Sequence, residues 1–432
     1  MNLKELEKRV KNSELKEELI GKRVVLVGWV EDIRDLGKII FIVIRDVSGK
    51  AQVLFLKEKK EIFELASKVT KHSIIKVSGF VKESKAKDLK VEVVAEDLKI
   101  VAEAKHPLPL DPSGRVPAKL DTRLNARALD LRNPRNLAIF KIRAQALQAI
   151  RSCFLKKGFI EIQTPKIIAA GAEGGATLFK VDYFEDIAYL AQSPQLYKEQ
   201  LTASLERVFE ISDFFRAEKS HTRRHLSQFT SVDLEAAYCD EEDVMEFLED
   251  IVVSCIKDVA KKCKEELALL NRNLKVPKRP FERITYSQAL EELYAMGRKL
   301  NFGEDLKDED LGHLGKKHRG FYFIVDWPLQ LKPFYIEGKN SELSRSFDLQ
   351  YGYLEIASGG MRVSRREVLE KRLKDLGVNL EGFKEHLETF SWGMPPHAGW
   401  GMGFDRLLMV ITGCKNIREV ILYPRDRFRL RP

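Results

Sequence analysis

A proline-rich segment divides the chain into two parts with different sequence patterns. The stretch HPLPLDPSGRVPAKLDTR at 106–123 carries four prolines, and prolines keep a chain stiff and extended. A chain of 432 residues is long enough for two domains, each with a core of its own. We therefore predict a first domain at 1–104, a linker at 105–130 and a second domain at 131–432.

The first part reads as a small closed barrel. Residues 22–103 form short runs rich in Val, Ile and Phe, which Gly, Asp, Ser and Lys interrupt. A pattern of four or five strands with one helix at 58–69 is typical of such a barrel. Residues 1–20 show apolar spacing that predicts a short amphipathic helix.

The second part mixes both periodicities. The run LAIFKIRAQALQAIRSCFLKKG predicts a long helix that ends at Gly158. The next run, FIEIQTPKII, reads as a strand interrupted at Pro165. Runs of strands then alternate with helices towards the C-terminus, which predicts an α+β domain on a largely antiparallel sheet.

Composition excludes several classes of protein. Apolar residues make up 44% and charged residues 32%, as in a globular and not a disordered chain. No apolar run approaches the roughly 20 residues that cross a bilayer, and no secretory signal is visible. The five cysteines form no CxxC pair, so we expect a cytoplasmic protein without disulfides or structural zinc. The net charge of +9 weakly favours a polyanionic partner.

The stretch FRAEKSHTRRHLSQF at 215–229 predicts a nucleotide clamp on two antiparallel strands. Arg216, Glu218 and Phe229 would share one face of the hairpin. An arginine suits phosphate oxygens, a phenylalanine ring can stack on a base, and a carboxylate can accept a hydrogen bond from an exocyclic amine. Arg224 and His225 would add positive charge. The alternative, a solvated hairpin with unrelated charges, stays open.

A second candidate phosphate site lies near the C-terminus. In GMPPHAGWGMGFDRLLMVITG, at 393–413, glycines stand at 399, 401 and 403 and allow a ligand to approach the backbone closely. A helix starts directly after them, so Arg406 would lie near its positive N-terminal end. A glycine-rich loop that merely packs is the alternative.

Together these segments resemble the signature motifs of class II aminoacyl-tRNA synthetases. GFIEIQTPKI resembles motif 1, the dimer-forming element; FRAE with RHLSQF resembles motif 2; GMGFDRLL resembles motif 3. The barrel is similar to the OB-fold anticodon domain of subclass IIb, and LDTRLNARALDLRNP and ILYPRDRFRLRP are similar to archaeal-type aspartyl-tRNA synthetases. The resemblance covers essentially the whole chain.

The resemblance implies a fold and an activity. The fold would be α+β, with an OB-fold β-barrel followed by a class II catalytic domain on an antiparallel sheet flanked by helices. The chain would be a homodimer through motif 1. It would activate L-aspartate with ATP and transfer it to tRNA(Asp), with tRNA(Asn) as an open second substrate. An asparaginyl-tRNA synthetase and a non-catalytic tRNA-binding paralogue remain alternatives.

The choice between aspartate and asparagine is a question of charge. A buried carboxylate must be met by positive charge, whereas an amide needs none. The resemblance assigns this role to Lys198 and Arg362. It completes the aspartate site with Glu173, Gln195, Leu196, Tyr197, Arg216 and Ser358. The wordings GGATLFK and AEKS are closer to asparagine enzymes and keep that alternative open.

The resemblance also implies sites for ATP and magnesium, with Arg216 and Arg406 as the catalytic residues. The implied ATP contacts are Arg216, Ala217, Glu218, Arg224, His225, Leu226, Phe229, Glu355, Gly403, Phe404, Asp405 and Arg406. Asp348, Glu355 and Ser358 would hold Mg²⁺, which prefers hard oxygen ligands. We expect the two carboxylates on one strand or its continuation.

In the barrel, the resemblance assigns anticodon reading to Arg34, Phe41, Gln52 and Lys85. An aromatic ring can stack on an unpaired base and an amide can bind its edge; the alternative for Phe41 is the barrel core. Glu31 occupies a position that helps relatives discriminate between tRNAs, and it matches neither usual choice.

Overall fold

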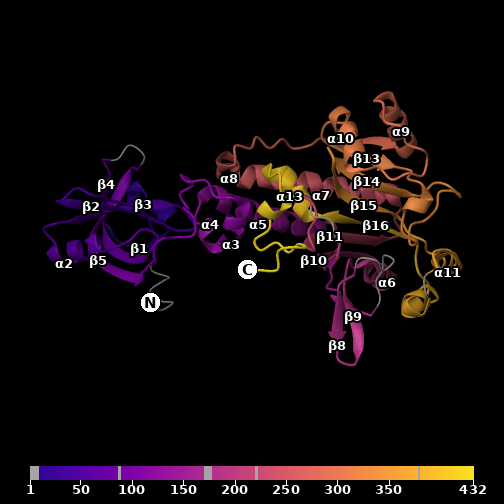
Figure 1. Ribbon diagram of the computed structural model, residues 1–432, viewed down its shortest axis with the longest axis horizontal. Coiled ribbons are helices and arrows are strands. Elements are labelled where there is room, and N and C mark those ends of the chain that lie inside the picture. Colours follow the sequence, from indigo (N-terminus) through magenta and orange to yellow (C-terminus); the bar gives the residue numbers. More distant parts are fainter. Residues whose placement is uncertain (1–8, 86–88, 170–177, 219–221, 378–379) are drawn as a thin grey trace. The chain divides into compact units, whose positions relative to one another are not determined.

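The computed structural model describes residues 9–85, 89–169, 178–218, 222–377 and 380–432 (Figure 1). The chain divides into two compact units, Met1–Pro117 and Ala118–Pro432, each with a hydrophobic core of its own. The linker predicted at 105–130 spans this division.

The first unit is a closed five-stranded barrel with strand order β1-β2-β3-β5-β4. Its elements are β1 (Arg23–Asp35), β2 (Ile39–Arg45), β3 (Lys50–Leu56), α2 (Lys60–Ser67), β4 (Ile74–Glu83) and β5 (Val91–Ala102). Alternate residues of each strand fill the interior, as Ile40, Ile42 and Ile44 of β2 do. The predicted barrel and the predicted helix after its third strand are confirmed.

The amphipathic helix predicted for residues 1–20 is wrong over the residues that the structure describes. Residues 9–20 contain only two short 3-10 turns, Asn12–Glu14 and Glu17–Leu19. The Asn12 amide donates to the carbonyl of Ile44 at 3.1 Å, and its backbone N–H donates to Asp46 at 3.1 Å. These bonds hold the segment against the barrel, where no continuous helix can follow the surface.

The second unit is built on an eight-stranded sheet with strand order β12-β13-β14-β15-β16-β11-β10-β6. Neighbouring strands are antiparallel except for the pairs β12/β13 and β10/β6, so the predicted α+β class is confirmed. The strands are β6 (Ile160–Glu161), β10 (Arg207–Phe215), β11 (Gln228–Ala237), β12 (Glu282–Thr285), β13 (Phe321–Val325), β14 (Ser346–Tyr351), β15 (Leu354–Met361) and β16 (His397–Gly403).

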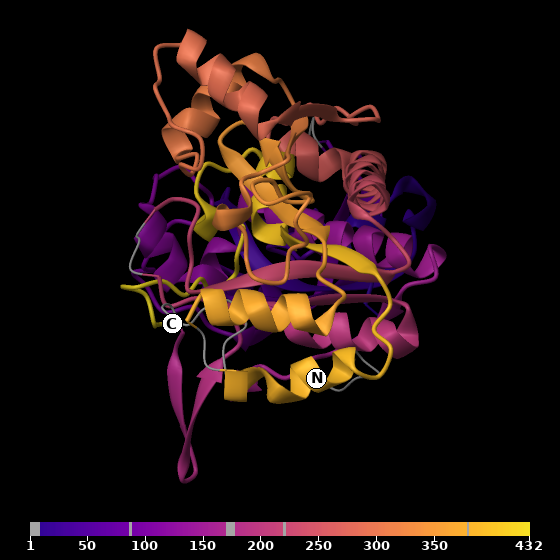
Figure 2. The same ribbon diagram turned by 90° about the vertical axis from the view of Figure 1, so that its right-hand side faces the viewer.

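The second unit also contains helices that pack around this sheet. They are α3 (Leu120–Asn125), α4 (Arg127–Asp130), α5 (Pro134–Lys156), α6 (Gln195–Leu205), α7 (Glu241–Lys262), α8 (Lys264–Leu269), α9 (Tyr286–Ala295), α10 (Asp308–Lys317), α11 (Arg366–Asp375), α12 (Lys384–Phe390) and α13 (Phe404–Thr412). A small sheet of β7 (Ile167–Ile168), β8 (Lys180–Tyr183) and β9 (Asp186–Leu190) carries the β8–β9 hairpin, which projects from the unit in both views (Figures 1 and 2).

The alternation of β11 decides where a site can form. Val232, Leu234 and Ala236 join the main core with α5, α7 and α13. Asp233 and Glu235 point to the other face, where α6 packs. Polar residues on this second face are therefore buried between the sheet and α6.

Among the described residues, no helix is long and apolar enough to cross a membrane.

Candidate active site

A cavity of about 300 Å³ lies over β10, β11, β15 and β16. Residues from the predicted segments at 215–229 and 393–413 meet there, together with residues of 192–198 and of β15. The predicted residues that line the cavity are Gln195, Arg216, Glu218, Arg224, His225, Leu226, Phe229, Glu355, Ser358, Arg362, Gly403, Asp405 and Arg406. The segments are far apart in sequence, and the antiparallel sheet is what brings them together.

The predicted clamp forms at the end of the β10–β11 hairpin. Phe214 pairs with Phe229 in the ladder, and the Arg216 N–H donates to the Ser227 carbonyl at 2.9 Å. The Arg216 guanidinium lies over the Phe229 ring, 5.2 Å from its centroid, and 4.0 Å from the Glu218 carboxylate. Charge and a stacking surface therefore share one face, as the sequence predicts.

His225 lies in surroundings that disfavour its charged form. Its Nδ1 lies 2.7 Å from the Thr222 hydroxyl. Burial lowers the pKa of His225, and the nearby guanidinium groups of Arg406 and Arg224 lower it further. The ring is therefore neutral at pH 7. Arg224 is held by an ion pair with Asp308 and donates to the Tyr353 carbonyl at 3.2 Å.

The junction from β16 to α13 places Arg406 at the cavity. Its guanidinium donates to the Glu355 carbonyl at 2.8 Å and lies 3.6 Å from the Glu355 carboxylate. Asp405 turns inward: it forms an ion pair with Arg143 and accepts from the Thr230 N–H at 2.8 Å. Phe404 is fully buried in the core. Arg406 therefore keeps its charged group at the cavity, whereas the charge of Asp405 is paired inside the protein.

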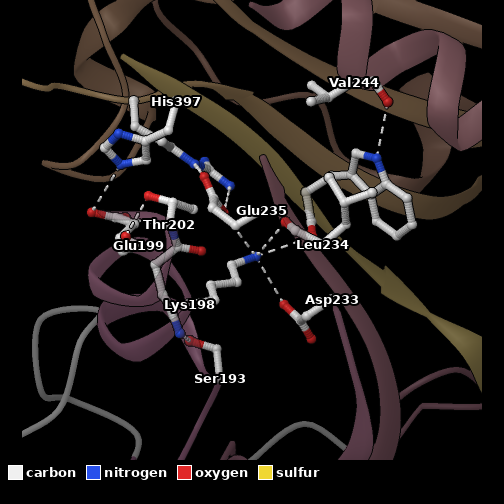
Figure 3. Close-up of polar contacts among 12 residues, drawn as sticks. Ser193, Lys198, Glu199, Thr202, Asp233, Leu234, Glu235, Val244 and His397 are labelled. Atoms are coloured by element: carbon white, nitrogen blue, oxygen red, sulfur yellow. Dashed lines mark hydrogen bonds and ion pairs between the residues drawn. The ribbon is translucent and has the colours of Figure 1, made fainter. Parts of the chain in front are cut away.

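The two predicted cations of the amino-acid pocket meet on one carboxylate (Figure 3). Lys198 Nζ lies 3.1 Å from Asp233 Oδ1 and 3.4 Å from Glu235 Oε2. Arg362 donates to both oxygens of Glu235, at 2.8 and 3.2 Å. All four side chains are buried. Arg362 and Asp233 line the cavity. Lys198 does not line it, but forms an ion pair with Asp233.

A glycine makes room for this network. A Cβ atom at Gly399 of β16 would lie 2.2 Å from Glu235 Oε2 and 2.3 Å from the Leu234 carbonyl oxygen. Such contacts are far inside van der Waals distance. Gly399 is therefore required for Glu235 to pack against β16, whatever ligand the cavity holds.

Six of the predicted site residues that the structure describes do not line the cavity. Two of them, Lys198 and Asp348, are buried and pair with the lining residues Asp233 and Lys332. Leu196 packs on the apolar cluster of α11 and α12, and Tyr197 packs on a cluster around Phe214. Phe404 lies in the core, and Ala217 is outside the lining. Glu173 lies outside the described residues.

The carboxylates predicted to hold magnesium, which we expected on one strand or its continuation, lie on two consecutive strands, β14 and β15. Asp348 of β14 is directly opposite Ser358 of β15, and Glu355 follows the turn on β15. Both oxygens of Asp348 accept from Lys332 Nζ, at 2.8 and 2.9 Å. Burial raises the pKa of Asp348, although the ammonium of Lys332 opposes this shift.

The predicted anticodon residues share the outer face of the barrel. Phe41 is half-buried between the fully buried Ile40 and Ile42, so it is not part of the barrel core. Arg34 pairs with Phe41, and Gln52 pairs with Val43, two residues along β2, which puts all three side chains on one face. Lys85 is exposed, and Glu31 forms an ion pair with Arg45.

Comparison with known proteins agrees with this geometry. The family model for class II tRNA synthetases (D, K and N) matches residues 119–427, and an OB-fold nucleic acid binding domain matches residues 24–101. The aspartate–tRNA(Asp/Asn) ligase of Methanocaldococcus jannaschii is 45% identical over 98% of this chain and 97% of its own length. The chain belongs to the archaeal-type aspartate–tRNA ligases.

Two further proteins are similar to this chain over nearly its whole length. The aspartate–tRNA(Asp) ligase of Pyrococcus abyssi is 47% identical, over 98% of this chain and 99% of that protein. The crystal structure of asparaginyl-tRNA synthetase from Pyrococcus horikoshii with asparaginyl-adenylate has a TM-score of 0.93. It is 33% identical and covers 98% of this chain and 99% of that structure. The ligase thus shares its fold with asparagine enzymes.

Sequence reasoning missed several groups that build the ligase site. Asp233, Glu235 and Lys332 hold the predicted residues, and Glu199 is fully buried behind them. One signal could have found two of them: in TSVDLEAA, polar and apolar residues alternate, which marks a strand with one polar face. The partners of those residues lie on distant elements and leave no local signal.

Proposed function

We propose that this ligase activates L-aspartate with ATP in the described cavity and charges both tRNA(Asp) and tRNA(Asn). The relative from Methanocaldococcus jannaschii is named for both tRNAs. One observation carries the amino-acid assignment: Arg362 and Lys198 meet on Glu235 at the cavity. A guanidinium has five N–H donors. Because Arg362 uses its Nε and Nη2 for Glu235, it retains donors for a second carboxylate.

In the first step, the aspartate α-carboxylate attacks the α-phosphorus of ATP and pyrophosphate leaves. In the second, a terminal tRNA hydroxyl attacks the carbonyl of aspartyl-adenylate and AMP leaves. The protein contributes mainly positioning and charge stabilisation. Phe229 stacks on adenine, Glu218 accepts from its amine, and Arg216 stabilises the charge on the α-phosphate.

Further groups complete the binding of both substrates. Arg406 and Arg224 hold the outer phosphates, with the neutral His225 as a hydrogen-bonding partner. Gln195 and Ser358 contact the aspartate, together with Glu173. No side-chain nucleophile takes part in this scheme.

The donor set of the proposed metal site suits magnesium. Asp348, Glu355 and Ser358 offer hard oxygens, and Mg²⁺ is commonly bound by one or two carboxylates together with substrate phosphates. When bound, the ion neutralises charge that develops on the phosphates. Lys332 bonds both oxygens of Asp348, so its ammonium offsets the charge of this carboxylate before a metal ion does.

The proposal includes the organisation of the whole ligase. Residues 1–104 read the anticodon, 105–130 form a hinge and 131–432 carry catalysis in the cytoplasm. We propose a homodimer through motif 1, because β6 is the edge strand of the main sheet and exposes an apolar side chain there, Ile160, which is 46% exposed. Ile167, in β7 of the small sheet, is 48% exposed and belongs to the same motif. An uncovered sheet edge with apolar side chains favours association.

ATP–pyrophosphate exchange with each amino acid tests the assignment. We expect exchange with L-aspartate, and we expect Lys198→Leu to abolish it while the protein stays folded. Exchange with asparagine but not aspartate would contradict the pocket, and tRNA retention without adenylate formation would indicate a non-catalytic protein. Charging purified tRNA(Asp) and tRNA(Asn) side by side tests the tRNA range; failure with tRNA(Asn) alone would restrict the ligase to tRNA(Asp).

A further inference from the structure

A buried carboxylate meets two histidines behind the amino-acid pocket. Glu199 lies on α6, His386 on α12 and His397 at the start of β16, and all three are at most 3% exposed. Glu199 Oε2 is 3.5 Å from His386 Nε2 and 3.8 Å from His397 Nε2. Figure 3 shows Glu199 and His397 next to the pair of Lys198 and Glu235. The proposed reaction uses none of these three residues.

The hydrogen bonds define which ring nitrogens carry protons. His397 Nδ1 lies 2.8 Å from the Pro395 carbonyl oxygen, which can only accept, so Nδ1 donates. A His397 ring with one proton would then turn the lone pair of Nε2 towards the Glu199 carboxylate. A doubly protonated ring is the state that fits. In contrast, His386 Nδ1 faces the amide nitrogen of Gln200 at 3.2 Å, so this ring nitrogen accepts and does not donate.

Electrostatics supports this assignment. Burial alone would lower the pKa of His397, but the negative charge of Glu199, whose Oε2 lies 3.8 Å from His397 Nε2, outweighs burial and raises it. Burial would likewise raise the pKa of Glu199, but the two histidines outweigh burial and hold it well below its ordinary range. A buried carboxylate and a buried imidazolium therefore stabilise each other.

Two contacts join this cluster to the cavity. Glu199 accepts a hydrogen bond from the Gln195 amide, and Gln195 lines the cavity. The backbone N–H of Arg362 donates to the backbone carbonyl of His397 at 2.9 Å. A change in the charge or position of His397 can therefore affect both Gln195 and Arg362, which line the pocket.

Charge counting explains why the cluster matters. The charged groups around it are Lys198 and Glu199 from α6, His386 from α12, Asp233 and Glu235 from β11, Arg362 from the end of β15 and His397 from β16. With an uncharged His397, three carboxylates face only two cations. An aspartate ligand adds a further negative charge to this buried region, whereas asparagine adds none.

We propose that His397 is a specificity-determining residue whose protonated ring, held by Glu199, supplies positive charge that favours aspartate over asparagine. This inference rests on the proposed aspartate pocket of Lys198 and Arg362. His397 acts through the field and through Arg362, so it is a positioning residue and does not contact the reacting atoms.

The sign of the pH dependence follows from the raised pKa. The charge of His397 is present at low pH and is lost as the pH rises through its folded pKa, which lies above the ordinary value of about 6.5. The KM for aspartate should therefore rise over this window. The inhibition constant of asparagine should change less, because an amide does not depend on the charge.

The test compares wild type, His397→Asn and Glu199→Gln. We measure the KM for aspartate and the Ki for asparagine in ATP–pyrophosphate exchange from about pH 5.5 to 8.5, where the free side chain of aspartate stays ionised. The asparagine amide can still donate to Pro395 but cannot become charged. At low pH, we expect His397→Asn to raise the KM for aspartate roughly tenfold relative to the Ki for asparagine. The ratio should then be independent of pH.

His318→Asn is the matched control. His318 is also a buried histidine between two glutamates, 2.8 Å from Glu282 and 2.7 Å from Glu292, but it lies outside the cavity lining. We expect its KM-to-Ki ratio and its pH profile to match wild type. Two results would overturn the inference and leave His397 with a structural role. One is an equal change of the KM-to-Ki ratio in this control. The other is an equal loss of affinity for aspartate and asparagine in His397→Asn.

A direct readout keeps the inference testable if a variant fails to fold. In wild-type protein labelled with ¹⁵N-histidine, one ring should show both nitrogens protonated at neutral pH, and the KM-to-Ki ratio should depend on pH. A flat wild-type profile or the absence of such a ring refutes the inference. If Lys198→Leu abolishes aspartate exchange while His397→Asn behaves as wild type, the pocket stands and only the role of His397 falls.

Discussion

At the scale of single residues, the site is a set of buried charges that share partners. Glu235 accepts from Arg362 and pairs with Lys198, and all three are at most 2% exposed. Burying ions costs more free energy than most ion pairs return, and an apolar replacement is often as stable. Their presence in the interior is therefore better explained by ligand recognition than by stability.

Neighbouring residues of α13 should separate stability from catalysis. Both residues line the cavity, but the Asp405 carboxylate is buried against Arg143 and the Thr230 N–H, whereas the Arg406 guanidinium lies beside Glu355. We expect Asp405→Asn to lower the free energy of unfolding by about 3 kcal/mol, because it leaves Arg143 without its carboxylate. Arg406→Ala should instead raise the KM for ATP about tenfold or more with little change in Tm.

Thermal unfolding and ATP–pyrophosphate exchange on the same two variants check this division. The wild-type protein with the same buffer and ATP concentrations serves as the reference. If Arg406→Ala destabilised the protein as much as Asp405→Asn, its role would be structural and the phosphate assignment would lose its support.

At the scale of elements, β16 positions the site through its glycines. Gly399 faces Glu235 and the Leu234 carbonyl, whereas a Cβ atom at Gly401 would meet only the end of the Asp233 side chain, 3.1 Å from Oδ1. We expect Gly399→Ala to cost about 3 kcal/mol and to displace Glu235, because the backbone of β11 cannot move away. Gly401→Ala should cost less than about 1 kcal/mol, since a side-chain end can shift.

Denaturant unfolding of the two alanine variants measures this difference. The pair is matched in strand, residue type and substitution. Equal losses of stability would mean that β11 and β16 adjust to each other more easily than the close contact at Gly399 implies.

Elements with a local signal could be predicted from the sequence. The β10–β11 hairpin and the start of α13 follow from alternation and from glycines that precede a helical pattern, and both place Arg216 and Arg406 as expected. Over the described residues 9–20, the helix expected at 1–20 does not form, and Asn12 bonds to the barrel instead. Asp348 and Glu355 lie on separate strands because the chain turns at Gly352, which has a φ of 60°. The sequence analysis did not predict this turn.

Contacts between distant elements could not be predicted. Nothing near Lys198 in the sequence shows that its ammonium lies between Asp233 and Glu235, or that His397 approaches Glu199. Such pairs are set by the register of β11 against β16 and by the packing of α6, which no periodicity within one segment encodes.

At the scale of the whole molecule, the proposed anticodon residues and the candidate active site belong to separate compact units. Phe41 lies on the outer barrel face with Arg34 and Gln52, and stacking of a base on an aromatic ring contributes about 1–3 kcal/mol. We expect Phe41→Ala to lower kcat/KM for tRNA charging roughly tenfold. ATP–pyrophosphate exchange should stay at the wild-type level, because the cavity draws no residue from the barrel.

Phe80→Ala is the matched control for this prediction. Phe80 is a more exposed phenylalanine of the barrel, 43% accessible on β4, and it pairs with Arg23 at the opposite end of β1 from Arg34. Its removal should leave both charging and exchange unchanged. A loss of exchange in Phe41→Ala would show that the barrel acts on the catalytic unit itself. Equal charging by both variants would remove Phe41 from the anticodon surface.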